Sequence, residues 1–211
     1  MIVILDLDYT LLDSAAFKQR LVDNLRELGV TNEQFFETYN AVRDSVPGQH
    51  GYSFGRQADL LHEMYGFDKG DVFTQLSRAC EALPEFLYPD SIPFLEALKE
   101  QHIHTALLTW ANRGHQEEKM RYLGISPYFA EIILTEQAKE SVQFAFPAPE
   151  SEWVFINDNP NELRALAARY PEARMIRIKR PQGKPFTPAE DTLDVPTFEN
   201  LDQVRLFSNL R

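Results

Sequence analysis

The sequence predicts an α/β protein whose core is built on a parallel sheet, with an all-helical domain inserted into it. Two observations predict this fold class. From Tyr88 onward, short apolar runs alternate with stretches of helical periodicity, which is typical of parallel strands joined by helices. The first apolar run, Ile2 to Leu5, is separated from the others by a long stretch of helical periodicity alone. We therefore predict a core domain of residues 1–13 and 88–211 and a helical domain of residues 14–87.

Within residues 14–87, the spacing of apolar residues predicts successive helices. The first carries a stripe from Phe17 to Leu28 and ends at Gly29, and Thr31 with Gln34 forms a capping box for the second. Glycines then predict a loop, whose polar residues include His50, Tyr52, Arg56 and Gln57. Two further helices follow, and Pro84 is expected to end the last of them.

The core strands are predicted from continuous apolar runs, which indicate burial on both faces of a sheet. After Ile2–Leu5, the expected strands cover residues 105–108, 132–134, 153–156 and 175–178. Helices are predicted around Phe94, before the strand of residues 105–108, and around Met120, before the strand of residues 132–134. A further helix, around Leu163, is predicted after the strand of residues 153–156.

The amino-acid composition disfavours some classes of binding partner. The 211 residues carry a formal net charge of −11, which disfavours binding to nucleic acid or to an anionic membrane surface. No apolar run approaches the length of a membrane span. The single cysteine, Cys80, cannot form an intramolecular disulfide. We expect a cytoplasmic protein, monomeric or homodimeric.

Polar residues follow the predicted strands at the points where the strands end. Asp6 and Asp8 follow the first, Thr109 the second, Lys139 comes a little after the third, and Asp158 follows the fourth. Carboxyl ends of parallel strands meet at one edge of a sheet, where ligands bind. Converging carboxylates need a cation, and an oxygen-rich site suits Mg²⁺. Such a site favours phosphoryl transfer, in which one carboxylate attacks phosphorus and another moves protons.

These motifs resemble those of the haloacid dehalogenase-like (HAD) hydrolases. Asp6-Leu7-Asp8-Tyr9-Thr10 looks like the first motif of that family, and the strand ending in Thr109 resembles the second. Lys139 stands where the third motif has its lysine, and Asn157-Asp158 with Glu162 resembles the fourth. The resemblance spans nearly the whole chain in the right order. It implies a Rossmann-like core with a helical cap inserted between the first and second motifs.

The resemblance also implies roles. Asp6 would be the nucleophile that forms an aspartyl-phosphate, and Asp8 would protonate the leaving oxygen and then activate water. Mg²⁺ would be held by the Asp6 side chain, the Asp8 main-chain carbonyl and Asp158, with Asn157 and Glu162 in its outer shell. Thr109 would bind phosphoryl oxygens, and Lys139 would balance charge. Relatives that cleave carbon–halogen bonds usually lack an aspartate at the position of Asp8, so phosphate esters are favoured.

Some assignments stay open at this level. The segment between Lys139 and Trp153 is short for a full crossover helix, so Arg113 or Lys119 is an alternative source of positive charge near the site. The basic residues Lys179, Arg180 and Lys184 are interpreted as a solvated connection. The substrate-binding candidates are Thr10, Trp110, Arg113, His50, Tyr52 and Arg56.

The sequence thus predicts a Mg²⁺-dependent phosphatase acting on a small phosphorylated metabolite. Two alternatives remain: a phosphotransferase or phosphomutase on the same scaffold, and a non-catalytic binding or regulatory protein of this fold.

Overall fold

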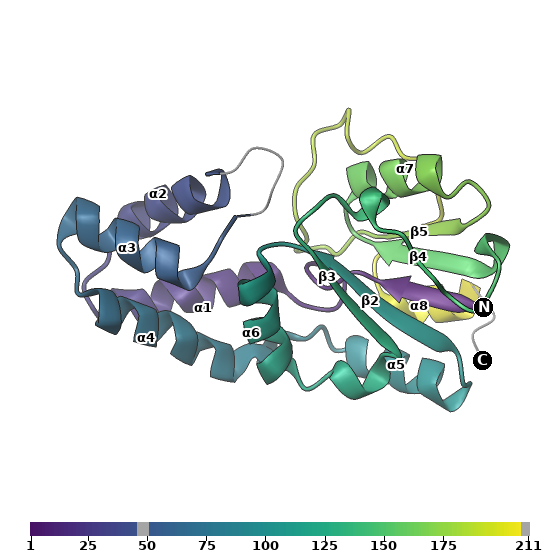
Figure 1. The fold of residues 1–211 in the computed structure, drawn as a ribbon, viewed down its shortest axis with the longest axis horizontal. Coiled ribbons are helices and arrows are strands. Elements are labelled where there is room, and N and C mark those ends of the chain that lie inside the picture. Colours follow the sequence, from purple (N-terminus) through teal and green to yellow (C-terminus); the bar gives the residue numbers. More distant parts are fainter. Residues whose placement is uncertain (46–50, 208–211) are drawn as a thin grey trace.

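The computed structural model describes residues 1–45 and 51–207. Its centre is a six-stranded sheet in the order β3-β2-β1-β4-β5-β6, with every neighbouring pair parallel (Figure 1). This order is that of a Rossmann-like sheet, so the predicted α/β fold class is confirmed. The strands are β1 (Ile2–Leu5), β2 (His104–Trp110), β3 (Glu131–Thr135), β4 (Trp153–Asn157), β5 (Arg174–Ile178) and β6 (Thr197–Phe198).

Helices cover both faces of the sheet. Helices α5 (Ser91–Glu100), α6 (Arg113–Leu123) and α8 (Leu201–Phe207) pack on one face, and α7 (Pro160–Arg169) packs on the other (Figure 1). Successive side chains of a strand point to opposite faces of the sheet, because the backbone is pleated. Leu5 belongs to the first apolar cluster and Ile4 to the second. Both faces are buried, which is why the strands read as continuous apolar runs.

An aromatic segment stands where a crossover helix between β3 and β4 would otherwise lie. The described chain has only the 3-10 turns η3 (Lys139–Ser141) and η4 (Glu150–Glu152) between these strands. Phe144 and Phe146 stack with ring centroids 5.0 Å apart, and Phe144 lies edge-on against Trp153 at 5.8 Å. Aromatic side chains therefore cover the α7 face of the sheet here, without a helix.

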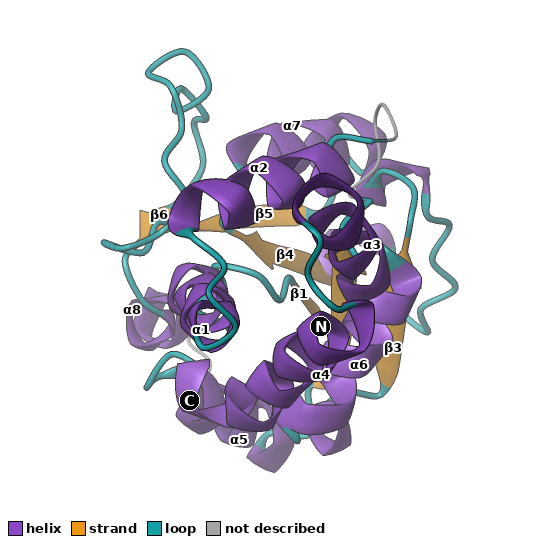
Figure 2. Cartoon of the chain, turned by 90° about the vertical axis from the view of Figure 1, so that its left-hand side faces the viewer, coloured by secondary structure: helices purple, strands orange, loops and turns teal. Residues whose placement is uncertain are grey.

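The segment between β1 and α5 is helical. It contains α1 (Ser14–Arg26), α2 (Asn32–Arg43), α3 (Phe54–Tyr65), α4 (Lys69–Ala79) and the 3-10 helix η1 (Cys80–Phe86). The capping box of Thr31 and Gln34 is present, and Gly29 adopts a φ of +87° after α1. Figure 2 shows α1 to α4 in front of the sheet, on the side toward which its carboxyl ends point. Cys80 is buried, and burial raises the pKa of its thiol to about 12.

Several boundaries differ from the predicted ones. Arg56 and Gln57 lie in α3, not in a loop, because Ser53 caps that helix and Gly55 falls within its first turn. Helix α4 ends at Ala79, and Pro84 lies inside η1, a tighter turn that continues it. Strand β6 and helix α8 were not predicted, because a two-residue strand is too short to show a period.

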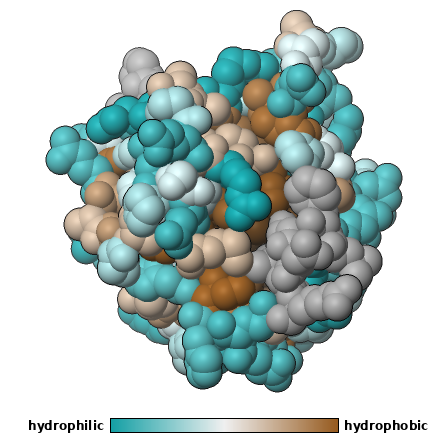
Figure 3. All heavy atoms as spheres, turned by 90° about the vertical axis from the view of Figure 1, so that its right-hand side faces the viewer, coloured by the Kyte–Doolittle hydropathy of each residue, from teal (hydrophilic) through white to brown (hydrophobic). Residues whose placement is uncertain are grey.

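The surface matches the polar composition. On the face seen in Figure 3, hydrophilic side chains surround smaller hydrophobic areas. Within the described residues, none of the helices combines the length and the apolar character that a bilayer span would require.

Candidate active site

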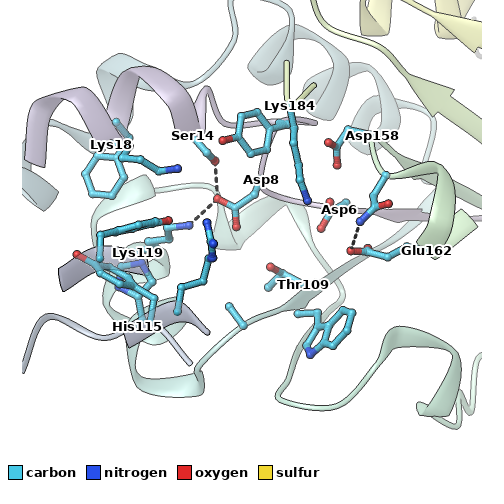
Figure 4. Close-up of a pocket in the computed structure, with 18 of the residues that line it drawn as sticks. Asp6, Asp8, Ser14, Lys18, Thr109, His115, Lys119, Asp158, Glu162 and Lys184 are labelled. Atoms are coloured by element: carbon cyan, nitrogen blue, oxygen red, sulfur yellow. Dashed lines mark hydrogen bonds and ion pairs between the residues drawn. The ribbon is translucent and has the colours of Figure 1, made fainter. Parts of the chain in front are cut away.

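The carboxyl ends of β1, β2 and β4 form the floor of a cavity of about 790 Å³. Strand β1 lies between the other two, with Leu5 level with Leu107 and Ile156. Asp6 therefore leaves β1 beside the ends of both neighbours, near Thr109 and Asp158 (Figure 4). The core contributes Asp6, Asp8, Thr109, Lys139, Asp158 and Glu162 to the cavity wall, and the inserted helices with the segment before α3 contribute Ser14, Phe17, Lys18, Leu21, Tyr39, Arg43 and Tyr52.

Asp6 is bound by a buried lysine. The Nζ atom of Lys139 lies 2.6 Å from Asp6 Oδ1 and 2.7 Å from Glu162 Oε2. Burial raises the pKa of Asp6 to about 7, although Lys139 acts in the opposite direction. Burial would lower the pKa of Lys139, but Asp6 and Glu162 outweigh it and raise that pKa. Lys139 thus stays a cation between two carboxylates, despite the short segment that follows it.

Asp158 contacts no lysine or arginine side chain through its carboxylate in the described part of the chain, although Lys139 and Lys184 act on it from a distance. Its carboxylate is buried, and among the described residues it has neither a hydrogen-bond donor nor an ion-pair partner. Burial raises its pKa well above the usual value, and the neighbouring Asp6 and Glu162 carboxylates raise it further. Unpaired buried carboxylates are costly unless a cation joins them.

The donor set fits Mg²⁺. Asp6 and Asp158 offer two hard carboxylates at the cavity floor, and Asp8 adds a main-chain carbonyl from the same turn. Over residues 1–45 and 51–207, no three histidine, cysteine or acidic side chains gather closely enough to hold a metal by themselves. Waters and a substrate oxygen would complete the coordination that Mg²⁺ usually keeps.

Glu162 is held in place by neighbours on its own turn. Asn157 Nδ2 donates to Glu162 Oε2 at 2.9 Å, and Asn159 Nδ2 donates to Oε1 at 2.9 Å. Burial would raise the pKa of Glu162, but Lys139 and these two amides have the larger combined effect, so the pKa of Glu162 is lowered. Asn157 and Glu162 therefore orient Lys139, beside Asp6, from behind the carboxylate floor.

Asp8 lies in quite different surroundings. Its Oδ1 atom accepts from Ser14 Oγ at 2.5 Å and from Lys119 Nζ at 2.6 Å, and its Oδ2 atom accepts from Gln116 Nε2 at 3.2 Å (Figure 4). Burial would raise its pKa, but Lys119 and these hydrogen bonds outweigh it and hold the pKa of Asp8 well below its usual value. The next residue, Tyr9, has a φ of +59°, a strained conformation that turns the chain away behind Asp8.

Helix α6 links Asp8 to Thr109. Asn112 caps this helix by accepting from the His115 main-chain N–H at 3.1 Å. One turn along, Gln116 Nε2 also donates to Thr109 Oγ1 at 2.8 Å. Gln116 and Lys119 share a face at the i, i+3 spacing. The helix therefore fixes both the second carboxylate and the threonine hydroxyl.

The candidate substrate-binding residues are only partly brought together. Trp110 and Tyr52 line the cavity. The indole of Trp110 donates to the Glu136 carbonyl at 3.2 Å, and the Tyr52 hydroxyl donates to Gln57 Oε1 at 2.5 Å. His115 lies edge-on to Tyr52 with centroids 5.0 Å apart, and burial lowers its pKa to about 3.

Three other candidates lie elsewhere. Thr10 is buried outside the cavity lining, and its carbonyl accepts from Arg180 Nη2 at 2.7 Å. Arg113 points into solvent and pairs with Glu117 at 2.8 Å, because it occupies the exposed face of the first turn of α6. Arg56 is exposed on α3, away from the cavity. His50 falls outside the described residues.

The sequence predicts a solvated connection for the basic stretch after β5. The structure differs at two of its three basic residues. Arg180 is buried, with Nη1 2.6 Å from Asp90 Oδ2, and Lys184 lines the cavity. Sequence reasoning also missed Ser14, Lys18 and Tyr39 as cavity residues, missed Gln116 as the partner of Asp8 and Thr109, and named Lys119 only as an alternative. The i, i+3 pair Gln116 and Lys119, on the face that also carries Met120 and Leu123, was the available signal.

Comparisons with known proteins agree with this fold. A glyceraldehyde 3-phosphate phosphatase of Methanopyrus kandleri is 26% identical over 216 residues, covering 93% of this chain and 91% of the relative. A solved haloacid dehalogenase-like hydrolase of Burkholderia xenovorans LB400 superposes with a TM-score of 0.77 at 19% identity, covering 99% and 97% of the two chains. An L-2-haloacid dehalogenase of Xanthobacter autotrophicus gives a TM-score of 0.64 at 13% identity, covering 99% and 98%. Residues 1–169 match the model of one family, and the chain belongs to it: the haloacid dehalogenase-like hydrolases.

Proposed function

We propose that this hydrolase cleaves a small phosphomonoester through a phosphoryl group carried on Asp6, with Mg²⁺ as cofactor. The observation that carries the proposal is the contrast between the two carboxylates that face one cavity. Asp6 is bound on one oxygen by Lys139, whereas Asp8 is held by Lys119, Ser14 and Gln116. Paired carboxylates in different surroundings are typical of a division between nucleophile and proton carrier.

Asp6 has the free oxygen that a nucleophile needs. Lys139 engages Oδ1, and no hydrogen bond reaches Oδ2 from the described residues. Asp8 is ionised in the ligand-free protein, so in this proposal it first takes a proton from the monoanionic phosphate ester that enters the cavity. In the first step Oδ2 attacks phosphorus, the bond from phosphorus to the ester oxygen breaks, and Asp8 passes that proton to the ester oxygen. The lysine keeps the attacking carboxylate oriented while charge develops on the phosphoryl group.

The second step restores the enzyme. Asp8 accepts a proton from water, whose oxygen attacks phosphorus, and the bond between phosphorus and Asp6 breaks to release inorganic phosphate. The proposal gives Thr109 the role of donating its hydroxyl to a phosphoryl oxygen, which its bond from Gln116 supports because Thr109 Oγ1 accepts there and keeps its own proton free. When bound, Mg²⁺ supplies positive charge that offsets the carboxylates and the phosphoryl oxygens.

The helical segment of residues 14–87 acts as a cap in this proposal. It forms one wall of the cavity opposite the sheet edge, through residues of α1 and α2 and through Tyr52. A wall of this kind limits the entry of bulk water and contacts the leaving group. The named activity of the Methanopyrus kandleri relative supports a small phosphorylated metabolite as the substrate class.

Phosphate release from a panel of phosphomonoesters, with Mg²⁺ and with EDTA, tests the proposal. We expect release that requires Mg²⁺ and that is lost in Asp6→Asn, whose folding is checked by its melting temperature. Asp59→Asn, on an exposed part of α3, is the matched control and should retain activity. Turnover by Asp6→Asn near the parental rate would remove Asp6 as nucleophile. Transfer of phosphate to an added sugar acceptor, without release of inorganic phosphate, would replace hydrolysis by phosphotransfer.

A further inference from the structure

Lys18, on helix α1, is a cation of the cavity wall that the proposed hydrolysis does not use. Its ammonium group has no ion pair or hydrogen bond among the described residues and lies 4.7 Å from the centre of the Tyr39 ring. Burial lowers the pKa of Lys18, and the nearby Arg43 guanidinium lowers it further. A partly buried, unpaired lysine beside another cation destabilises the ligand-free protein.

Three other cations of the cavity wall already have acidic partners. Lys139 pairs with Asp6 and Glu162, and Lys119 pairs with Asp8. Arg43 engages both oxygens of Asp44, each at 2.7 Å. Lys184 is the remaining cation of the wall among the described residues, and in the view of Figure 4 its side chain extends toward the region of Asp6 and Asp8. Lys18 therefore stands apart as the unpaired cation on the cap side of Asp8.

The position of Lys18 along α1 indicates which part of a substrate it meets. Ser14, one helical turn earlier, contacts Asp8 at 2.5 Å. Residues four apart share a helix face about 5–6 Å from each other, so Lys18 lies one turn beyond the proton carrier. In Figure 4, Lys18 and Asp6 are on opposite sides of Asp8. A group bound at Lys18 is thus farther from phosphorus than the ester oxygen.

We propose that Lys18 binds a second anionic group, a carboxylate or another phosphate, on the leaving group of the substrate. This inference rests on the proposed phosphatase function and narrows its substrate class. The cavity of about 790 Å³ has room for such a leaving group beside the phosphoryl site. The Tyr39 ring, which packs 4.5 Å from Tyr52, gives the carbon skeleton a flat apolar wall.

Three-carbon phosphates provide matched probes. Glycerol 3-phosphate, 3-phosphoglycerate and glycerol 1,3-bisphosphate share a skeleton and differ at the far end, which is an alcohol, a carboxylate or a second phosphate. We expect the wild-type protein to prefer one or both of the anionic probes over glycerol 3-phosphate in kcat/KM. The preferred probe identifies which anionic group the subsite accepts.

Lys18→Met removes the charge and keeps much of the side-chain length. It should lower kcat/KM for the preferred anionic probe about 10- to 100-fold, mainly through KM, as expected for the loss of a charged hydrogen bond. The loss for glycerol 3-phosphate should be much smaller, and Lys18→Arg should restore the preference. Arg20→Met makes the same charge change on α1 outside the cavity lining and should have no effect.

A binding measurement tests the Lys18 subsite independently of the proposed phosphatase activity. Isothermal calorimetry on Asp6→Asn, with and without Lys18→Met, measures affinity for the same three probes without turnover. A Lys18-dependent preference for an anionic probe, together with no phosphate release by wild-type protein, would leave the subsite in place and reject the hydrolysis. Equal losses for all three probes would assign Lys18 to the phosphoryl group, and no preference in binding or turnover would reject the subsite.

Discussion

Lys119 Nζ lies 2.6 Å from Asp8 Oδ1, and these two residues come from elements more than a hundred residues apart in the chain. The lysine belongs to the buried face of α6, with only 6% of its side chain exposed, whereas the Asp8 side chain is 29% exposed toward the cavity. A lysine can occupy that position because the carboxylate neutralises it. The pair therefore fixes the second carboxylate, while its other oxygen accepts only the longer bond from Gln116 at 3.2 Å and the side chain still lines the cavity.

Lys119→Met tests whether this contact orients the proton carrier. Without the ammonium, Asp8 keeps only the bonds from Ser14 and Gln116, and we expect kcat/KM for alkyl phosphates to fall about 10- to 100-fold. The loss should be smaller for p-nitrophenyl phosphate, whose leaving group departs without a proton. Steady-state kinetics on both esters measure the difference. Lys119→Arg should recover part of the activity, and equal losses on both esters would show that the contact is merely structural.

Asp158→Asn tests the proposed metal ligand through stability as well as activity. The buried carboxylate has two acidic neighbours, so the amide should raise the melting temperature of the metal-free protein by about 2–4 °C, equivalent to roughly 1 kcal/mol. Added Mg²⁺ should raise the melting temperature of wild-type protein and leave that of the variant unchanged. Thermal scans in EDTA and across a Mg²⁺ titration check both expectations. An unchanged Mg²⁺ response would remove Asp158 from the ligand set.

The strand ends could be predicted because their physical signal is local. Strands β1 and β4 are buried along their whole length, so each appears as an uninterrupted apolar run that ends at a polar residue. Parallel pairing then brings Asp6 and Asp158 together, whatever the connecting segments do. The position of Lys139 beside Asp6 followed from motif order, although spacing alone left it in doubt.

The cap side of the cavity could not be predicted in the same way. Lysine is usually a surface residue, so the sequence does not distinguish Lys18 and Lys184 from other exposed lysines. Their place in the cavity depends on how α1 and the loop after β5 meet the sheet. Arg113 shows the converse. It follows the second motif closely in sequence, but it is the first residue of α6, and its side chain extends into solvent to pair with Glu117, whereas Gln116 one turn later is buried.

His115 should make stability depend on pH. Its pKa is about 3 in the folded protein, lowered by burial and by Lys119, against an ordinary value of 6.5. Between these values the unfolded chain binds more protons, so stability falls as the pH is lowered from 6.5 toward 3. At pH 5 the loss from this residue is about 2 kcal/mol relative to pH 7.

The measurement is urea unfolding at pH 7 and pH 5 for wild-type protein and His115→Phe, which keeps a ring against Tyr52 and Phe54. The variant should lose less stability between these pH values than wild-type protein. Parallel losses in the two proteins would mean that His115 titrates normally in the folded state.

Arg180 ties three distant segments together, and its loss should be among the more damaging single changes. Its guanidinium lies 2.6 Å from Asp90, donates to the Thr10 carbonyl at 2.7 Å and stacks 4.0 Å from the centre of the Tyr88 ring. Asp90 also accepts from the first main-chain N–H of α8 at 2.7 Å. Arg180→Met leaves Asp90 buried without its cation, which should cost about 3–5 kcal/mol of unfolding free energy.

Lys179→Met is the matched control, because the neighbouring lysine is 55% exposed and pairs with Asp191 at the surface. Its effect should stay within about 1 kcal/mol. Urea unfolding of the two variants compares them directly. Because Arg180 also holds the turn that carries Asp8, Arg180→Met should lower kcat even under conditions where the variant is fully folded. Equal stability of the two variants would show that the buried ion pair contributes nothing beyond a surface pair, and unchanged kcat would separate the Thr10 contact from the position of Asp8.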